Sequence, residues 1–204
     1  MIIIIISLLT IFVILKNNVF NKQKSEEVID KTKVEEYITT FKSANYHAKL
    51  SYYMKEKEGS PVYFEKDYDY KDNIAKINLY DKKTEYINYK TKEHYLLDDG
   101  KLAKMDYKEK SDHENILELL SSYEIVEENK DNYVLKLPEK NIEKFFDNYK
   151  DIFKYNKKYN YELIMIVDGT NITEIHLKAT ENKYIDYKFT NINQIGNIEI
   201  PKSS

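Results

Sequence analysis

A run of short alternating segments joined by short polar turns is the feature that most constrains how this chain can fold. In the first of them, residues 46–55, apolar or aromatic side chains alternate with polar ones, which is typical of a β-strand with one packed face. The turn Asp98-Asp99-Gly100 is typical of a hairpin, because glycine tolerates the positive φ that such a turn needs. Connections this short cannot hold a parallel crossover, so neighbouring strands must be antiparallel. We place the other strands of this meander at residues 62–70, 73–80, 85–89, 93–97 and 101–107.

Helices are predicted where the apolar spacing changes to three and four residues. Thr32-Lys33-Val34-Glu35 and Ser111-Asp112-His113-Glu114 both have the form of a capping box, with Thr32 and Ser111 as the N-cap residues. The strongest helical pattern runs from Ile142 to Phe153, where one face is apolar and the other carries Lys, Asp and Glu. We expect this helix to cover one face of the sheet.

The chain returns to strands near its end. A hairpin of residues 123–127 and 132–137 precedes the last helix. Residues 161–167 are apolar on both faces from Leu163 onward, which predicts a central strand covered on both sides. Asp168-Gly169-Thr170 then turns the chain into residues 172–179, and a further inward row begins at Ile185. These segments predict a three-strand antiparallel module.

The first residues of the chain form an uncharged apolar run from Met1 to Leu15, interrupted only by Ser7 and Thr10. A helix of that length spans roughly 22 Å, short of a hydrocarbon core of roughly 30 Å, which favours a signal-peptide core. No small-x-small cleavage site follows, and a helix continued to Phe20 would span the core. We therefore predict a signal peptide or uncleaved membrane anchor at residues 1–20, a polar linker at 21–31 and one domain at 32–204.

Composition excludes several classes of function. The 32 basic residues, all Lys, nearly balance 35 acidic ones, so nothing favours nucleic-acid binding. The absence of Cys removes thiol nucleophiles, Cys-ligated zinc and lipid attachment through an N-terminal Cys. The four His have no metal-binding spacing, and no Ser lies in a G-x-S-x-G elbow. The sequence predicts no enzyme, no metal site and no cofactor.

The order of these segments resembles the LolA/LppX-like family of extracytoplasmic lipoprotein-carrier domains. The residues that carry the resemblance are Asn45-Tyr46 before the first strand, 95–102 in the central hairpin, and 189–193 with 198–201 at the end. It implies an α+β fold: a strongly curved antiparallel β-sheet, or half-barrel, with helices over its concave face and an apolar cavity for acyl chains. Relatives often carry a lipidated Cys, and the carriers proper an Arg in the cavity. This chain has neither, so membrane attachment would rest on residues 1–20, on the extracytoplasmic side of the cell membrane.

Two hypotheses for function follow. In the first, a secreted or membrane-anchored domain binds a lipid or other hydrophobic ligand, without catalysis, in a cavity lined by Leu50, Tyr52, Met54, Leu163, Met165, Leu177 and Tyr187. Its lid would be the helix that carries Ile142, Phe145, Phe146 and Tyr149. In the second, the same fold has a filled core and serves as a protein-interaction or sensory domain. A void of roughly 300 Å³ between helices and sheet would favour the first hypothesis, and side chains meeting across that space the second.

Overall fold

The structure is a computed structural model of the 204-residue chain, described for residues 31–55, 61–79, 82–107, 110–149, 155–180 and 182–201. The chain divides into two units, Met1–Asp30 and Lys31–Ser204, and all the described residues belong to the second. The predicted anchor at 1–20 and nearly all of the predicted linker therefore lie outside the described residues. Among the described residues, no helix is both long enough and apolar enough to cross a membrane.

Helices α2, α3 and α4 span Lys31–Lys42, Asp112–Leu119 and Glu139–Asp147. The capping box before α3 is confirmed, because the Glu114 N–H donates to the Ser111 hydroxyl at 3.0 Å and the Ser111 N–H donates to the Glu114 carboxylate at 3.2 Å. Thr32, the other predicted cap, lies inside α2, which already includes Lys31. Helix α4 ends earlier than predicted, with Asn148 as its C-cap, and residues 150–154 lie outside the description.

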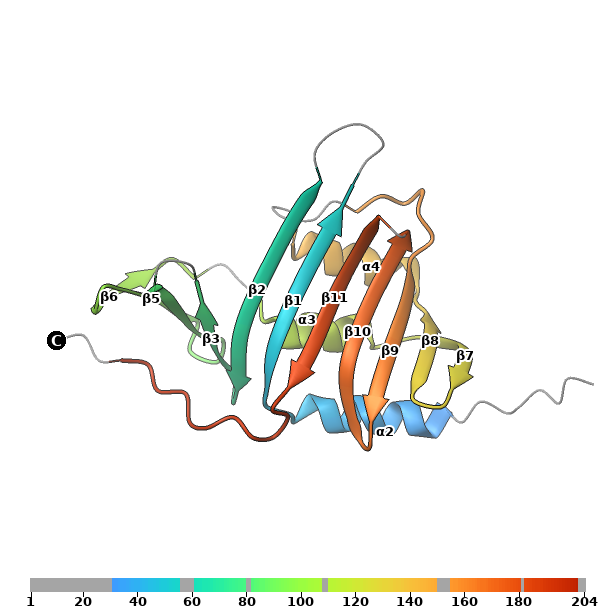
Figure 1. Ribbon diagram of the computed structural model, residues 1–204, viewed down its shortest axis with the longest axis horizontal. Helices are drawn as coiled ribbons and strands as arrows, with labels where there is room; N and C mark the ends of the chain where they lie inside the picture. The colour runs from blue at the N-terminus through green and yellow to red at the C-terminus, as the bar shows by residue number, and fades with distance from the viewer. Residues whose placement is uncertain are drawn as a thin grey trace, which may run out of the picture. The chain divides into compact units, whose positions relative to one another are not determined.

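The strands form one open antiparallel sheet of 11 strands, in the order β6-β5-β4-β3-β2-β1-β11-β10-β9-β8-β7 (Figure 1). The predicted meander is therefore confirmed. At the hairpin of β5 and β6, Asp99 and Gly100 have φ of 48° and 76°, the positive values that a tight two-residue turn requires. The strands are β1 Tyr46–Met54, β2 Val62–Lys71, β3 Ile74–Asn78, β4 Thr84–Asn88, β5 Glu93–Asp98, β6 Lys101–Met105, β7 Glu124–Asn129, β8 Asn132–Lys136, β9 Glu162–Asp168, β10 Asn171–Thr180 and β11 Lys183–Thr190.

The first and last strands meet at the centre of the sheet. Strand β1 pairs on one side with β2, where Ala48 faces Tyr68, and on the other with β11, where Ala48 faces Phe189. The chain after β11 is held beside the start of β1, because the Asn193 N–H donates to the Asn45 carbonyl at 2.7 Å. Two of the segments that carried the family resemblance, at Asn45 and at Asn193, thus lie together.

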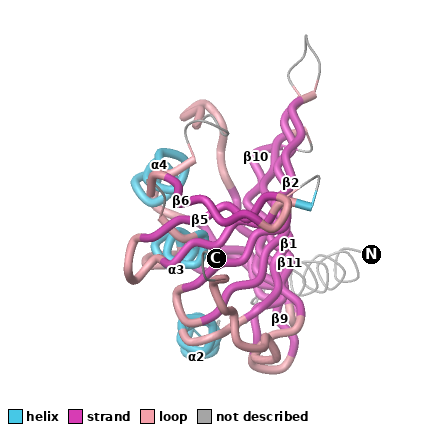
Figure 2. The backbone as a smooth tube through the Cα atoms, turned by 90° about the vertical axis from the view of Figure 1, so that its left-hand side faces the viewer, coloured by secondary structure: helices cyan, strands magenta, loops and turns pink. Residues whose placement is uncertain are grey.

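The helices all lie on one face of the sheet, which we call the concave face (Figure 2). Alternate residues of β1, β9, β10 and β11 are buried on this face and form a single hydrophobic core with α2, α3 and α4. The expected curved α+β half-barrel with helices over its concave face is thereby confirmed. On the opposite, convex face, Ile164 and Ile166 of β9 are only half-buried. The prediction of a strand covered on both sides is therefore wrong, because the described helices cover only one face.

Candidate functional site

The residues predicted to line a cavity come together on the concave face. They lie on β1, β9, β10 and β11, and the cross-strand pairs Leu50–Tyr187, Tyr187–Ile175 and Ile175–Met165 place them in neighbouring rows. All are fully buried except Met54, which is half-buried at the end of β1. The members of this face are Leu50, Tyr52, Met54, Leu163, Met165, Leu177 and Tyr187.

The predicted lid residues face the core. Ile142, Phe145 and Phe146 of α4 are buried, and the ring of Phe146 lies 5.2 Å from that of Tyr161 between centroids. The other side of α4 carries the charged residues Glu139, Lys140, Glu143 and Lys144. Helix α4 is therefore an amphipathic cover over the concave face, and Tyr149 lies just beyond its end.

A buried polar chain joins this cover to the sheet and to α3. The Tyr149 hydroxyl donates to the Asp112 carboxylate, and the hydroxyls of Tyr149 and Tyr187 are 3.0 Å apart. Because Tyr149 has one hydroxyl hydrogen and donates it to Asp112, Tyr187 must donate to Tyr149. Asp112 also forms an ion pair with Lys66 of β2, at 3.0 Å between Nζ and Oδ2. The helices and two strands of the sheet are thus connected by directional contacts inside the core.

Burial determines how the charges in this polar chain are compensated and raises the pKa values of its tyrosines. The side chains of Asp112 and Lys66 are 3% and 16% exposed, so each charge depends on the other for compensation. Burial, reinforced by the nearby Asp112 carboxylate, raises the pKa of Tyr149 and of Tyr187 well above the usual tyrosine range. Both phenols are therefore protonated at neutral pH and act as hydrogen-bond donors.

His113 forms a second polar joint at the base of α3. A carbonyl oxygen can only accept, so the His113 Nε2–H donates to the Lys42 carbonyl at 3.1 Å. Its Nδ1 then accepts from the Tyr46 hydroxyl, also at 3.1 Å. The imidazole stacks on Tyr70 with 4.6 Å between ring centroids, and burial lowers its pKa. A neutral His113 therefore ties together α2, α3, β1 and β2.

This polar chain could not be predicted from the sequence. Lys66 and Asp112 lie far apart in the sequence, and so do Tyr149 and Tyr187. One signal was present, since Lys66 occupies the same face of β2 as the buried Tyr68 and Tyr70. A charge at an inward position of a strand indicates a buried partner.

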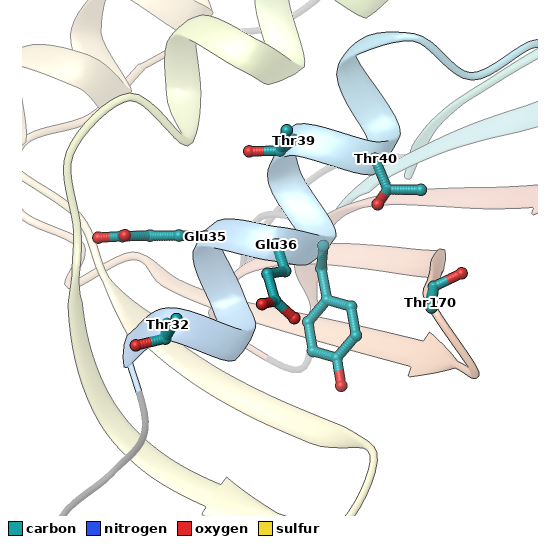
Figure 3. A pocket seen from close by; sticks show the side chains of 7 residues that line it. Thr32, Glu35, Glu36, Thr39, Thr40 and Thr170 are labelled. Atoms are coloured by element: carbon teal, nitrogen blue, oxygen red, sulfur yellow. The ribbon is translucent and has the colours of Figure 1, made fainter.

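A pocket of about 380 Å³ lies elsewhere, beside α2 (Figure 3). Most of its lining comes from α2, and Thr170 is contributed by the turn between β9 and β10. None of the predicted cavity residues lines it. The lining residues are Thr32, Glu35, Glu36, Tyr37, Thr39, Thr40 and Thr170.

Comparisons with known proteins give matches only among solved structures. No protein-family model and no curated protein matches the sequence. The structure is similar to the lipoprotein LppX of Mycobacterium tuberculosis, with a TM-score of 0.48 and 11% identity over 82% of this chain and 97% of that one. It is also similar to LprF of Mycobacterium bovis, with a TM-score of 0.49 and 10% identity over 84% and 95% of the two chains. A LolA superfamily protein of Nitrosomonas europaea matches with a TM-score of 0.36 and 8% identity over 82% and 94%.

Proposed function

We propose that this is a non-catalytic, extracytoplasmic domain that binds a lipid or another hydrophobic molecule between the concave face and α4. Residues 1–20 would hold it at the membrane. The observation that carries the proposal is the continuous apolar face formed by Leu50, Leu163, Met165 and Leu177, covered by an amphipathic helical layer. The arrangement of an open sheet with helices on one side supports the proposal, because a ligand between the two layers would contact apolar side chains of both.

Binding requires α4 to move away from the sheet, because its side chains fill the interface in this structure. Uncovering Ile142, Phe145 and Phe146 would cost about 1.5–3 kcal/mol for each side chain returned to water. A long acyl chain offsets that cost, since each buried CH₂ contributes about 0.8 kcal/mol. The Tyr149 hydroxyl would leave Asp112 and Tyr187 in the same movement. In the complex, contacts between the ligand and the concave face would therefore replace the apolar contacts that α4 loses.

A second candidate function is a filled-core domain that binds a protein partner on its sheet surface. The contact between Tyr149 and Tyr187 favours this alternative, because the end of α4 and strand β11 are in direct contact there, with the two hydroxyls 3.0 Å apart. In this alternative, the polar chain is permanent and α4 stays in place.

Native mass spectrometry of the full-length chain, purified from a membrane-containing host and transferred to amphipol, tests the proposal. The expected result is a co-purifying lipid, together with a rise in Tm when phosphatidylcholine vesicles that contain dioleoylglycerol are added, beyond any rise with phosphatidylcholine alone. The absence of any bound lipid together with an unchanged Tm would overturn lipid binding and leave the filled-core domain.

The Asp112→Asn and Phe146→Leu variants sharpen this test. Asp112→Asn weakens the polar chain that holds the cover closed, and should increase lipid uptake relative to the wild type. Phe146→Leu keeps an apolar side chain on the inner side of α4 and serves as the matched control. Equal uptake by all three proteins would contradict the role of α4 as a lid.

A further inference from the structure

The hydroxyl of Tyr68 is a buried polar group without a hydrogen-bond partner among the described residues. The residue lies on β2 and is 1% exposed. The Tyr46 hydroxyl donates to His113 Nδ1 and lies close enough for the Tyr68 hydroxyl to offset part of the rise that burial causes in the pKa of Tyr46, but the two phenols do not reach hydrogen-bond geometry. Native proteins rarely leave a buried hydroxyl unpaired, because such a group loses its water contacts and gains nothing in exchange. We therefore expect the Tyr68 hydroxyl to have a hydrogen-bond partner when the protein is in its functional state.

The position of Tyr68 places its hydroxyl in the middle of the concave face. Its cross-strand neighbour is Ala48, the smallest side chain in the inward row of β1. Asp112, Tyr46, Tyr187 and Tyr149 are close enough to raise its pKa further, after the larger effect of burial. The hydroxyl thus faces the same interface that the proposed ligand would occupy, next to the polar chain that closes it.

Two other described side chains have a buried polar atom without a hydrogen-bond partner, Tyr123 and His94, although His94 Nε2 lies 3.7 Å from the Glu85 carboxylate. Tyr123 precedes the edge strand β7, and His94 lies on β5, near the opposite edge of the sheet. Tyr68 lies on β2, next to β1, and is close to Tyr149 and Tyr187. It is therefore the one of these three that a ligand under α4 would meet.

We propose that Tyr68 is the polar recognition point for the head of an uncharged amphiphile, and donates its hydroxyl hydrogen to an ester or amide carbonyl oxygen of the ligand. This inference rests on the proposed function and adds the chemical class of the ligand. When Tyr149 leaves with α4, Tyr187 loses its acceptor as well, so two phenolic donors on β2 and β11 face the ligand.

The neighbouring charges exclude an anionic head. Lys66 is already paired with Asp112 at 3.0 Å, so among the described residues this cation is not available to compensate a phosphate or a carboxylate. The buried Asp112 carboxylate would repel such a group directly. A neutral carbonyl avoids both costs and still accepts a hydrogen bond from a phenol.

The test compares Tyr68→Phe with the wild type as full-length proteins in amphipol. The probes are dioleoylglycerol, which has ester carbonyls, oleate, which is anionic, and hexadecane, which has no acceptor. We expect the Kd for dioleoylglycerol to rise about three- to tenfold in the variant and that for hexadecane to stay unchanged. Without ligand, the variant should be as stable as the wild type or more so, because it no longer buries an unpaired hydroxyl.

Tyr70→Phe is the matched control. Tyr70 lies two residues further along β2 on the same face, and its hydroxyl already donates to Asn73 at 3.3 Å. Removal of the Tyr70 hydroxyl should leave the ratio of the Kd for dioleoylglycerol to the Kd for hexadecane unchanged. Equal binding of dioleoylglycerol by Tyr68→Phe and wild type would assign the hydroxyl to a buried water and overturn the inference, and so would a preference of the wild type for oleate. If the wild type binds none of the probes, the proposed function fails first and the inference with it.

Discussion

On the concave face, alternate residues of the central strands enter one apolar core, whereas on the convex face several of the residues between them form ion pairs. Lys49 lies 2.7 Å from Glu65, and His176 lies between Asp186 and Glu174 at 2.8 and 3.0 Å. Pairs of this kind contribute little to stability, because water and salt screen charges at the surface. A buried leucine contributes about 1.5–3 kcal/mol through its transfer from water alone. The same strands therefore draw their stability from one face and leave the other free to vary.

Two neighbouring residues on β9 should show the largest difference in stability between the two faces. Leu163→Ala removes a side chain that is fully buried on the concave face and should lower the free energy of unfolding by about 2–5 kcal/mol. Ile164→Ala removes a half-buried side chain from the convex face and should cost less than half as much. Urea unfolding of both variants measures the difference. Equal losses would show that the convex face is covered in solution.

A smaller effect is expected from the polar chain. Tyr149→Phe deletes one hydroxyl, which leaves Asp112 with one donor fewer and Tyr187 without its acceptor. The free energy of unfolding should fall by about 1–3 kcal/mol. Tyr155→Phe is the control, because its hydroxyl donates to Glu139 in an exposed position, and its loss should be near zero. A Tyr149→Phe protein as stable as the control would indicate that water replaces the hydroxyl.

The smallest effect concerns two histidines. His113 lies in the helical layer on the concave face, and His176 lies on the convex face. Burial lowers the pKa of His113, so its contribution to stability is complete above about pH 6.5 and is lost as the pH falls toward that lowered pKa. The hydrogen bond to Asp186 raises the pKa of His176, so its contribution is complete below about pH 6.5 and is lost as the pH rises through that raised pKa. The contributions of His113 and His176 to stability should therefore change with pH in opposite directions.

Urea midpoints of the wild type, His113→Gln and His176→Gln between about pH 5 and 8 check those signs. The stability difference between wild type and His113→Gln should shrink as the pH falls. The corresponding difference for His176→Gln should shrink as the pH rises. Two differences that change in the same direction would refute the assignment of one neutral and one charged imidazole.

The same contrast explains which features could be predicted from the sequence. Local patterns were sufficient for the alternation in β1, the turn at Asp99 and Gly100, and the capping box at Ser111, because each depends on residues a few positions apart. The inward set from Leu50 to Tyr187 followed from alternation alone. The apolar run of β9 was misleading, because hydrophobic side chains also occur on an uncovered face.

Contacts between distant elements could not be predicted in this way. Helix α4 ends before the apolar stripe does, and the C-cap residue Asn148 uses its side-chain amide to donate to Asn115 of α3 at 2.7 Å. The polar chain through Asp112 and the orphaned hydroxyl of Tyr68 likewise depend on how β2, α3 and α4 are placed in space. Sequence spacing carries no information on such placement.

The pairing of β1 with β11 also determines how the chain can reach its fold. Every other strand pair joins consecutive strands, whereas this pair closes a loop from His47 to Thr190. Closing so long a loop costs entropy before its contacts contribute, so non-local pairs form late. We therefore expect two meanders, β1 to β6 and β7 to β11, to form early, and the pairing of β1 with β11 to join them into one sheet later.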